Sequence, residues 1–319
     1  MILNDMIDGI KKANDMIIVT HISPDGDGLG CVTAMYKAMI KINKNVNVFI
    51  DDKLPDIYRF LPYIEKITKP FDKKADLLFI IDCADENRMG NAKELLKTIP
   101  ISINIDHHIS NTLYATMNYV DTNAASSAEI IYQIIKMLGI DIDSDIAKCL
   151  YTGIVTDTGS FMYSSTTSFT HEVAGDLINN GVSVSEISDK IFHNIKFNKL
   201  KLIGKILNKI ELYENNKIAY MEIKNEDFIE TGTDLTDVEN IINYGRDIDS
   251  VEVAVLLVEN NDEVKGSLRS KNYINVNKIA KEFNGGGHVR ASGFTINGKL
   301  SNIKEQILKA IKNELNEGY

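Results

Sequence analysis

Residues 16–30, MIIVTHISPDGDGLG, combine three patterns in one short stretch. An apolar, β-branched run comes first, a segment of turn-forming residues follows, and a helical pattern begins near residue 28 and continues to about 41. A buried strand that leads through a turn into a helix is typical of a parallel sheet covered by helices. The stretch therefore predicts an α/β fold, and it places the polar side chains of the turn at the carboxyl end of a strand.

The same alternation continues through the first half of the chain. Three more apolar runs are predicted strands: VNVFI at 46–50, ADLLFIID at 75–82 and ISINIDHH at 101–108. Helical patterns follow at about 126–138 and 144–156, and Ser126 precedes Glu129 at the spacing of a capping box. Near-continuous apolar strands separated by helices indicate a mostly parallel sheet with helices on both faces.

The chain is long enough for two domains, since its 319 residues are about twice the roughly 150 residues of an average domain. We expect an N-terminal domain at 1–188, a lysine-rich helical linker at 189–212 and a smaller α+β domain at 213–319. The last of these contains two hairpin patterns, each turned by a pair of asparagines. Its helical patterns lie near 234–244, 276–283 and 301–316.

Composition restricts the class of protein. Hydrophobic residues make up 44% and charged residues 25% of the chain, as in an ordinary globular protein. The net charge of −10 argues against binding of long nucleic acid, which needs a basic surface, so an anionic substrate is expected to be small or bound through metal ions. No apolar run approaches the ~20 residues of a membrane span, and three widely spaced cysteines indicate reduced thiols. We therefore expect a cytoplasmic protein.

Polar side chains come directly after three of the predicted strands. They are His21 after the first strand, Asp82 at the end of the third, and Asp106, His107 and His108 at the end of the fourth. Ligands of open parallel sheets bind at the carboxyl ends of the strands, so these side chains are expected to meet at one edge. An acid followed by two imidazoles offers two kinds of metal ligand.

The turn after the first strand adds two carboxylates. Asp25 and Asp27 are one residue apart and repel each other unless positive charge lies between them. Two divalent cations about 3.5 to 4 Å apart would relieve this repulsion and present a template for in-line attack on phosphorus. The alternative is a loop of glycine and proline in which Asp27 caps a helix that begins near Leu29.

A further acid follows a helical stripe. Ile146, Leu150 and Ile154 are spaced to share one face of a helix, and Asp157 comes three residues later on that face. A carboxylate directed toward a core is costly unless it is paired or bound to a metal. Asp157 also fits a helix-cap or loop acid, and Asp82 taken alone also fits a turn residue.

These motifs together resemble those of a known superfamily. HISPDGDGLG, the strand that ends in Asp82, IDHH and GIVTDTG occur in the order and character of the four motifs of the DHH phosphoesterases. The near-full length of the chain, with NGGGHVRASGF near its end, is similar to the family of nanoRNases (oligoribonucleases) that are also adenosine 3',5'-bisphosphate (pAp) phosphatases. The resemblance implies a DHH catalytic domain at 1–188 and a DHH-associated, substrate-binding domain at 213–319.

The resemblance also implies the metal ligands. The first expected set is His21, Asp25 and Asp82, and the second is Asp27, Asp82, His107 and Asp157. Asp82 would bridge the two ions, Asp106 would support the site, and His108 would touch the scissile phosphate or the leaving group. The resemblance favours Mn²⁺, with Co²⁺ or Mg²⁺ as alternatives, and a water acidified by both ions is the expected nucleophile.

A glycine-rich loop in the second domain is a candidate substrate-binding site. The candidate residues are Arg269, Ser270, Gly285, Gly286, Gly287 and His288. The backbone N–H groups of three consecutive glycines can surround an anion, the histidine adds a donor, and a guanidinium binds a terminal phosphate bidentately. The resemblance implies that this loop and this arginine bind substrate. A glycine-rich turn without function is the alternative.

We therefore expect a two-metal hydrolase of small nucleotides. It would cleave short RNA oligonucleotides, such as the dinucleotide pApA, to mononucleotides and would dephosphorylate pAp. Alternatives are a cyclic di-AMP phosphodiesterase, a manganese-dependent inorganic pyrophosphatase, which lacks GGGH, and a RecJ-type exonuclease, which carries a further domain. A non-catalytic nucleotide sensor would be expected to lack a metal ligand, and none of the six is missing. We expect neither long nucleic acid nor a membrane as a partner, and the sequence is compatible with a homodimer.

Overall fold

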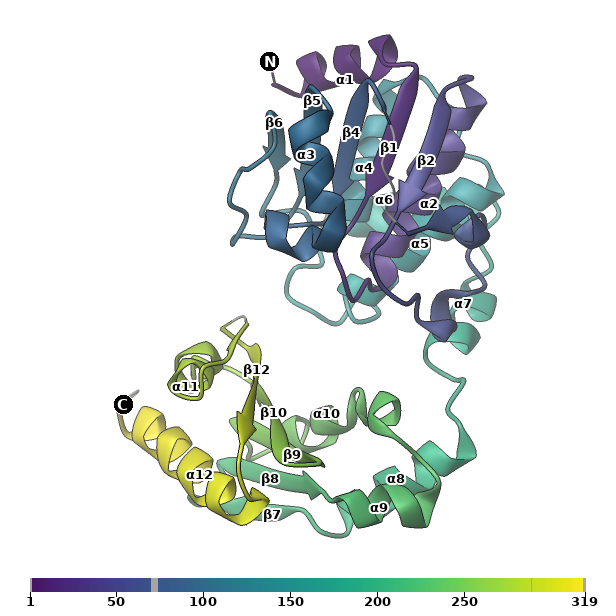
Figure 1. The fold of residues 1–319 in the computed structure, drawn as a ribbon. Helices are drawn as coiled ribbons and strands as arrows, with labels where there is room; N and C mark the ends of the chain where they lie inside the picture. The colour runs from purple at the N-terminus through teal and green to yellow at the C-terminus, as the bar shows by residue number, and fades with distance from the viewer. Residues whose placement is uncertain (1, 70–73, 288, 318–319) are drawn as a thin grey trace. The chain divides into compact units, whose positions relative to one another are not determined.

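The computed structural model describes residues 2–69, 74–287 and 289–317. The chain forms two compact units, Met1–Asn194 and Ile195–Tyr319. Each unit has its own six-stranded sheet (Figure 1). The α/β fold class predicted from the sequence is confirmed.

The first unit contains an entirely parallel sheet with the strand order β3-β2-β1-β4-β5-β6. Its strands are β1 Asp15–Val19, β2 Asn45–Phe49, β3 Ile67–Thr68, β4 Leu77–Ile81, β5 Ile101–Asp106 and β6 Met117–Val120. The four predicted strands are confirmed as β1, β2, β4 and β5. The edge strands β3 and β6 are two and four residues long, which is too short for an apolar period to be recognised in the sequence.

The strand order reverses between β1 and β4. The chain runs outward from β1 through β2 to β3, returns to the middle of the sheet, and runs outward on the other side from β4 through β5 to β6. At such a reversal the loops that follow the two central strands diverge and leave a crevice at their carboxyl ends. The residues after β1 and β4 are therefore placed side by side at this point.

Helices cover both faces of this sheet, but unequally. The segments are α1 Ile2–Lys12, α2 Gly26–Lys41, η3 Glu86–Glu94, α3 Leu95–Thr98, α4 Ser127–Met137, α5 Ser144–Asp157, α6 Ser168–Asn179 and α7 Val184–Ile191. One face of β1 packs through Met16 and Ile18 against α1, α2 and their neighbours, while Ile17 and Val19 face η3 and α3. Figure 1 shows α3 in front of the sheet and α4, α5 and α6 behind it.

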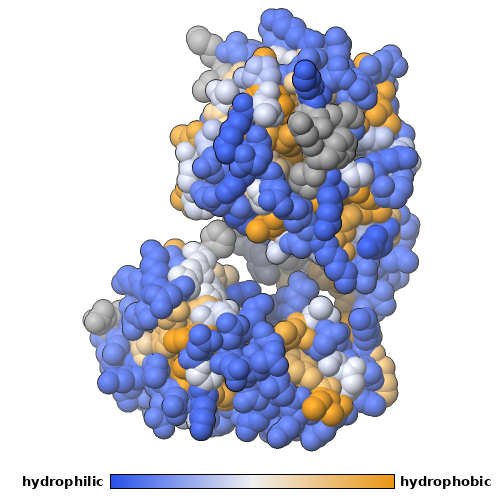
Figure 2. All heavy atoms as spheres, in the orientation of Figure 1, coloured by the Kyte–Doolittle hydropathy of each residue, from blue (hydrophilic) through white to orange (hydrophobic). Residues whose placement is uncertain are grey.

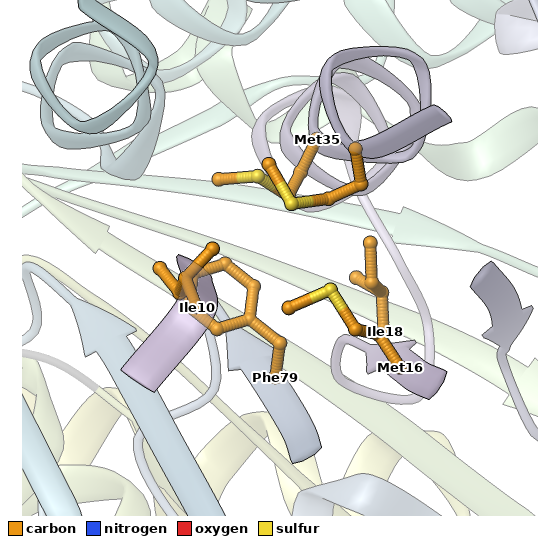
Figure 3. A pocket seen from close by; sticks show the side chains of 6 residues that line it. Ile10, Met16, Ile18, Met35 and Phe79 are labelled. Carbon is orange, nitrogen blue, oxygen red and sulfur yellow. The ribbon is translucent and has the colours of Figure 1, made fainter. Parts of the chain in front are cut away.

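The larger core is tightly packed beneath α2. Figure 3 shows Ile10, Met16, Ile18, Met35 and Phe79 converging from α1, β1, α2 and β4. The space between these side chains does not admit a water molecule. Such packing fixes the sheet rigidly under the loops at its carboxyl edge.

The capping box predicted at α4 forms only in part. The Ser126 hydroxyl accepts a hydrogen bond from Glu129 N at 3.4 Å, as expected for an N-cap. The Glu129 carboxylate, however, accepts from Ala125 N at 3.2 Å rather than from the cap residue itself. The helix start is thus predicted correctly. The bond that Glu129 returns comes from Ala125 N, one residue before the N-cap, instead of from Ser126 N.

The second unit contains a mixed sheet in the order β11-β12-β10-β9-β8-β7. Its strands are β7 Glu211–Tyr213, β8 Ile218–Ile223, β9 Val253–Asn260, β10 Glu263–Ser270, β11 Gly286–Gly287 and β12 Ala291–Asn297. Both predicted hairpins, β7–β8 and β9–β10, are confirmed as antiparallel pairs, whereas β8 and β9 are parallel. Asn215 and Asn216 adopt the left-handed conformation that the first hairpin turn requires.

Helices cover both faces of the second sheet. They are α8 Phe197–Leu207, α9 Asn225–Thr231, α10 Ile241–Arg246, α11 Val276–Glu282 and α12 Leu300–Glu317, with a 3-10 turn at Leu235–Val238. The helix predicted at 234–244 is interrupted, because Asn240 is left-handed between the 3-10 turn and α10. Within the range predicted as a linker, 189–212, α8 contributes Leu202 and Ile206 to the core of the second unit.

The face of each unit that is visible in Figure 2 is mostly polar. Figure 2 shows hydrophilic side chains over most of the visible face of each unit, with apolar side chains in small separate patches. In the described part of the chain, no helix combines the length and the apolar composition that a membrane span requires.

Candidate metal centre

Six side chains predicted as ligands converge at the carboxyl edge of the parallel sheet. His21 follows β1, Asp82 follows β4 and His107 follows β5, while Asp25 and Asp27 lie at the start of α2 and Asp157 ends α5. Together with His108, which is not among the six, they form three overlapping groups in which the donor atoms lie within 4.8 Å of one another. The groups are His21, Asp25 and Asp82; Asp27, His107 and Asp157; and Asp82, His107 and His108.

Asp82 lies between the two histidines. Its Oδ2 is 3.5 Å from His21 Nε2, and its Oδ1 is 3.7 Å from His107 Nε2. The backbone of Asp82 is left-handed, with φ of 57°, a conformation that is uncommon outside glycine and that aspartate tolerates better than most residues. This conformation turns the side chain so that one carboxylate presents a different oxygen to each histidine.

The start of α2 orients the two acids differently. Asp25 is the N-cap residue and accepts hydrogen bonds from Asp27 N at 3.1 Å and Gly28 N at 3.0 Å. The alternative in which Asp27 caps a helix beginning near Leu29 is therefore wrong, because the helix begins three residues earlier, at Gly26. Asp27 lies buried inside the first turn of α2.

The start of α4 fixes Asp27 from the other side. The two carboxylate oxygens of Asp27 accept hydrogen bonds from Ser127 N at 2.7 Å and Ala128 N at 3.0 Å. The Ser127 hydroxyl also donates to Asp82 Oδ1 at 2.9 Å. Sequence reasoning missed Ser127, since only its place at a predicted helix start distinguishes it from other serines.

Glycines keep this region open. A Cβ on Gly28 would lie 2.8 Å from Thr20 Oγ1 and 3.3 Å from His21 Nε2. Thr20 Oγ1 is buried and has no hydrogen-bond partner among the described residues. A Cβ on Gly153 of α5 would lie 2.7 Å from Asp27 Oδ1. Gly28 therefore leaves room between the donor atoms, and Gly153 allows α5 to approach α2 closely.

The acids of the centre are short of positive charge. Burial, followed by the charges of Asp82 and Asp157, raises the pKa of Asp27 well above its usual value. Burial and the nearby Asp82 and Asp25 raise the pKa of Asp157 in the same way. The cost of placing these carboxylates together is relieved by cations between them. Oxygen and imidazole donors around a small open space fit divalent metal ions.

Asp25 is the most exposed of the six candidate ligands, whereas its neighbour His21 is buried. Although burial lowers it, the pKa of His21 is raised to about 10 by the nearby carboxylates of Asp25 and Asp82. Against the effect of burial, His21 and two backbone N–H groups lower the pKa of Asp25 to about 2. His21 Nδ1 lies 2.7 Å from Ile22 O; when Nδ1 donates there, a metal ion that replaces the proton on Nε2 binds the lone pair of that atom.

Asp106 and His108 form a pair beside the predicted ligands. His108 Nδ1 is 2.7 Å from Asp106 Oδ1, which also accepts from His107 N at 2.9 Å. Burial opposes ionisation of Asp106, but His108, Asn111 and the His107 backbone together lower its pKa. Burial lowers and the hydrogen bond to Asp106 raises the pKa of His108, with a net rise. The buried carboxylate thus fixes the orientation of the imidazole ring.

The described members of the substrate-binding set predicted in the second unit lie at the end of β10 and in or next to β11. Arg269 donates from Nη1 to Leu268 O at 3.0 Å, and the buried Ser270 donates its hydroxyl to Ile274 O at 2.7 Å. Gly286 and Gly287 form β11 and pair with β12.

Two of the three glycines in this loop are required by close contacts. A Cβ on Gly285 would lie 2.2 Å from Gly293 O, and one on Gly287 would lie 2.6 Å from Ala291 O, whereas nothing lies within 4 Å at Gly286. His288 lies outside the described residues. Binding of an anion by this loop stays a prediction.

Two family descriptions match the chain. The DHH family, N-terminal domain, matches residues 15–154, and the DHHA1 domain matches residues 215–317. The first match contains five of the six candidate ligands, and Asp157 lies three residues beyond its end. The second lies within the unit Ile195–Tyr319.

Named relatives match over nearly the whole chain. The bifunctional oligoribonuclease and PAP phosphatase NrnA of Thermus thermophilus is 30% identical, with 95% of this chain and 91% of the relative covered. The protein of the same name from Bacillus subtilis is 29% identical, with 92% of each covered. Among solved structures, an exopolyphosphatase-related protein from Bacteroides fragilis has a TM-score of 0.91 at 26% identity, covering 99% of this chain and 95% of that one.

Proposed function

The chain belongs to the DHH family and carries a DHHA1 domain, and on this premise we propose that it is a two-metal phosphoesterase of short RNA and small nucleotides. It hydrolyses dinucleotides such as pApA to mononucleotides and removes a phosphate from adenosine 3',5'-bisphosphate. The observation that carries the proposal is the convergence of six acidic and imidazole side chains, in which Asp82 lies between His21 and His107. Relatives that match along most of the chain carry the name of this bifunctional activity.

The proposed metal ligands follow two of the groups of donor atoms, with Asp82 added to the second because its Oδ1 lies 3.7 Å from His107 Nε2. His21, Asp25 and Asp82 hold the first ion, and Asp27, Asp82, His107 and Asp157 hold the second, with one oxygen of Asp82 directed to each side. When bound, the two ions neutralise charge on the scissile phosphate and acidify a water for attack on phosphorus. We propose Mn²⁺ as the physiological ion, with Co²⁺ and Mg²⁺ as the alternatives to be compared.

Neighbouring residues orient His108 and two of the proposed metal ligands. Asp106 accepts from Nδ1 of His108, so that Nε2 is the ring atom that contacts the scissile phosphate or the departing oxygen. Ser127 orients Asp82 and Asp27 through its hydroxyl and its backbone N–H. These contacts fix the orientation of Asp27, Asp82 and His108 in the protein without substrate.

The second unit supplies recognition of the substrate end. We propose that the Arg269 guanidinium binds a terminal phosphate and that the backbone of Gly285–Gly287, together with His288, completes this anion site. Because the Ser270 hydroxyl is bonded to Ile274 O, its contribution is to shape the loop rather than to contact substrate. A net charge of −10 agrees with small substrates, since long nucleic acid needs a basic surface.

The proposal is tested by one comparison of substrates. Protein stripped of metal and reloaded with Mn²⁺ is given pApA, pAp, cyclic di-AMP and pyrophosphate side by side, with Co²⁺ and Mg²⁺ in parallel. Hydrolysis of pApA and pAp that depends on the added metal is the expected result. Faster turnover of cyclic di-AMP would favour the cyclic dinucleotide phosphodiesterase, and turnover of pyrophosphate alone would favour the pyrophosphatase.

Assembly and location are part of the proposal. We propose a homodimer, which sedimentation of the purified protein measures directly. A cytoplasmic location also stays a prediction, and the free, buried state of Cys31, Cys83 and Cys149 agrees with a reducing compartment.

A further inference from the structure

We propose that Asn111 is a positioning residue, which orients Asp106 and through it His108 by means of the two N–H donors of its amide. Asn111 lies in the loop after β5, outside the candidate metal ligands. The inference rests on the proposed function only in its kinetic part. Its structural part concerns contacts that exist in the protein without substrate.

All three contacts of the Asn111 amide fix its orientation. Nδ2 donates to Asp106 Oδ2 at 2.6 Å and to Asn104 Oδ1 at 2.8 Å. Oδ1 accepts from Leu113 N at 2.8 Å and closes a turn within the loop. A flipped amide would present an oxygen to two acceptors, so only this orientation satisfies the three bonds.

Asn104 links this loop to the backbone around Asp82. Asn104 is fully buried on β5, and its Nδ2 donates to Cys83 O at 3.2 Å and to Ile80 O at 3.4 Å. These two carbonyls lie on either side of Asp82, whose backbone is left-handed. The asparagine pair therefore connects the end of β4, which carries the proposed bridging ligand, to the end of β5, which carries Asp106.

Asp106 depends on Asn111 for one of its two oxygens. Oδ1 accepts from His107 N and His108 Nδ1, while Oδ2 accepts from Asn111. Hydrogen bonds to a carboxylate are stronger than those between neutral groups, and a buried carboxylate oxygen left without its donor is costly. Loss of the Asn111 donors is expected to rotate the carboxylate and to move the His108 ring away from its working orientation.

Two substitutions at position 111 separate the donors from the turn. Asn111→Asp keeps the acceptor for Leu113 N but removes both donors and places a second carboxylate against Asp106. Asn111→Ala removes donors and acceptor together and adds no charge. If Asn111 only shapes the loop, N111D is the milder variant; if its donors position Asp106, N111D is at least as damaging as N111A.

Asn118, in β6 at the far end of this loop, offers a matched control. Its Nδ2 donates to Ala115 O at 2.8 Å and to Leu113 O at 3.2 Å, and its Oδ1 accepts from Ala115 N at 3.1 Å. Its amide makes three hydrogen bonds, as that of Asn111 does, but all three go to the loop and none to Asp106. Asn118→Ala therefore reports the effect of loosening the loop alone.

The kinetic test uses the Mn²⁺-loaded protein with pApA. We expect N111D to lower kcat about 10- to 100-fold, with KM changed less than about threefold and both ions retained, while N118A stays within about threefold of wild type in kcat. N111A is expected to lower kcat at least about tenfold, and it decides the question if N111D does not fold. A kcat for N111D above half that of wild type, or an equal loss in N118A, would overturn the proposal.

A structural readout separates this inference from the proposed function. In crystals of N111D or N111A, His108 Nδ1 and Asp106 Oδ1 are expected to lie farther apart than the 2.7 Å that separates them here, beyond hydrogen-bonding distance. An unchanged contact would refute the positioning role. If wild-type protein cleaves none of the substrates offered, the proposed function fails, and this distance still decides the role of Asn111.

Discussion

Asp82 shows how much of the site depends on the conformation of one residue. Its left-handed backbone turns the carboxylate so that Oδ1 faces His107 and Oδ2 faces His21, at 3.7 and 3.5 Å. An acid in the extended conformation at the end of a strand would direct its side chain elsewhere. The cost of the uncommon backbone is offset by fixed contacts, including Asp82 N to Ile105 O at 2.9 Å.

Asp82→Asn is the sharpest test of a shared ligand. Asparagine tolerates the left-handed backbone and keeps the shape of the side chain, so the change removes charge with little strain. We expect both ions to bind more weakly. We also expect activity to fall by more than the roughly 10- to 100-fold that is typical when a residue hydrogen-bonded to a metal ligand is replaced. Calorimetric titration of metal-free protein with Mn²⁺ measures the stoichiometry and both affinities.

The control is the same substitution on an exposed acid of the same unit. Asp8→Asn on α1 changes the net charge equally and lies on the exposed side of that helix. It is expected to bind both ions like wild type. Loss of only one ion from D82N would show that Asp82 does not bridge.

At the scale of elements, the approach of α2 to α5 brings Asp27 and Asp157 into one site. Gly30 of α2 lies so close to α5 that a Cβ would be 2.4 Å from Cys149 O. Gly153 of α5 has the matching role, with Asp27 as its neighbour. Gly30 and Gly153 are helical and do not have a positive φ, so their small size, not their flexibility, is what the site requires.

Gly153→Ala tests this close contact. The added Cβ would lie 2.7 Å from Asp27 Oδ1 and 2.8 Å from Ala128 Cβ, so either the helices separate or the carboxylate moves. We expect a fall of about 1–3 kcal/mol in the free energy of unfolding, as for other overpacked sites. The second ion is expected to bind about 10-fold more weakly or worse, because Asp27 is displaced.

Gly175→Ala on α6 is the matched control, since nothing lies within 4 Å of its added Cβ. It is expected to leave metal binding unchanged and to stabilise the fold by about 0.4–1 kcal/mol, because alanine restricts the unfolded chain. Urea unfolding and metal titration of both variants give the comparison. Wild-type affinity for both ions in G153A would contradict the role given to this glycine.

At the scale of the whole molecule, the two units divide the chemistry. All six candidate metal ligands lie in Met1–Asn194, and the candidate substrate-end residues lie in Ile195–Tyr319. We therefore expect metal ions to bind and stabilise the first unit, and the end of the substrate to bind the second.

Addition of Mn²⁺ to metal-free protein is expected to stabilise the first unit alone. A ligand that binds only the folded state stabilises it by about 2.7 kcal/mol when its concentration is 100 times its dissociation constant. Hydrogen exchange followed by mass spectrometry should slow in Met1–Asn194, most of all near β1, β4 and the start of α2, and D82N should show no such change. Slowing confined to residues 195–319 would place the ions elsewhere.

Arg269→Ala is expected to affect recognition rather than hydrolysis itself. The KM for pApA should rise at least about 10-fold, since a bidentate pair of charge-assisted bonds is lost, whereas bis-p-nitrophenyl phosphate, which lacks a terminal phosphate, should be little affected. Arg246→Ala on α10, whose guanidinium pairs with Asp247 at 2.8 Å, serves as the control. Equal losses on both substrates would show that Arg269 does not bind the substrate end.

The sequence by itself determined the elements and the chemistry that they carry. Strands such as β1 and β4, the turn at Asn215–Asn216 and the acids and histidines at strand ends are readable because apolar period and turn preference are local properties of the chain. The edge strands β3 and β6 were missed because they are too short to show a period.

Only the tertiary structure decided how these groups meet. Asp27 and Ser127 are 100 residues apart in sequence, and nothing local to either predicts their hydrogen bond. The left-handed Asp82 is fixed by contacts from β5, and the Asn104–Asn111 pair connects two strand ends that are adjacent only in the folded sheet. Side-chain direction at the centre depends on such long-range contacts, which exist only once the sheet and the helices on it have packed.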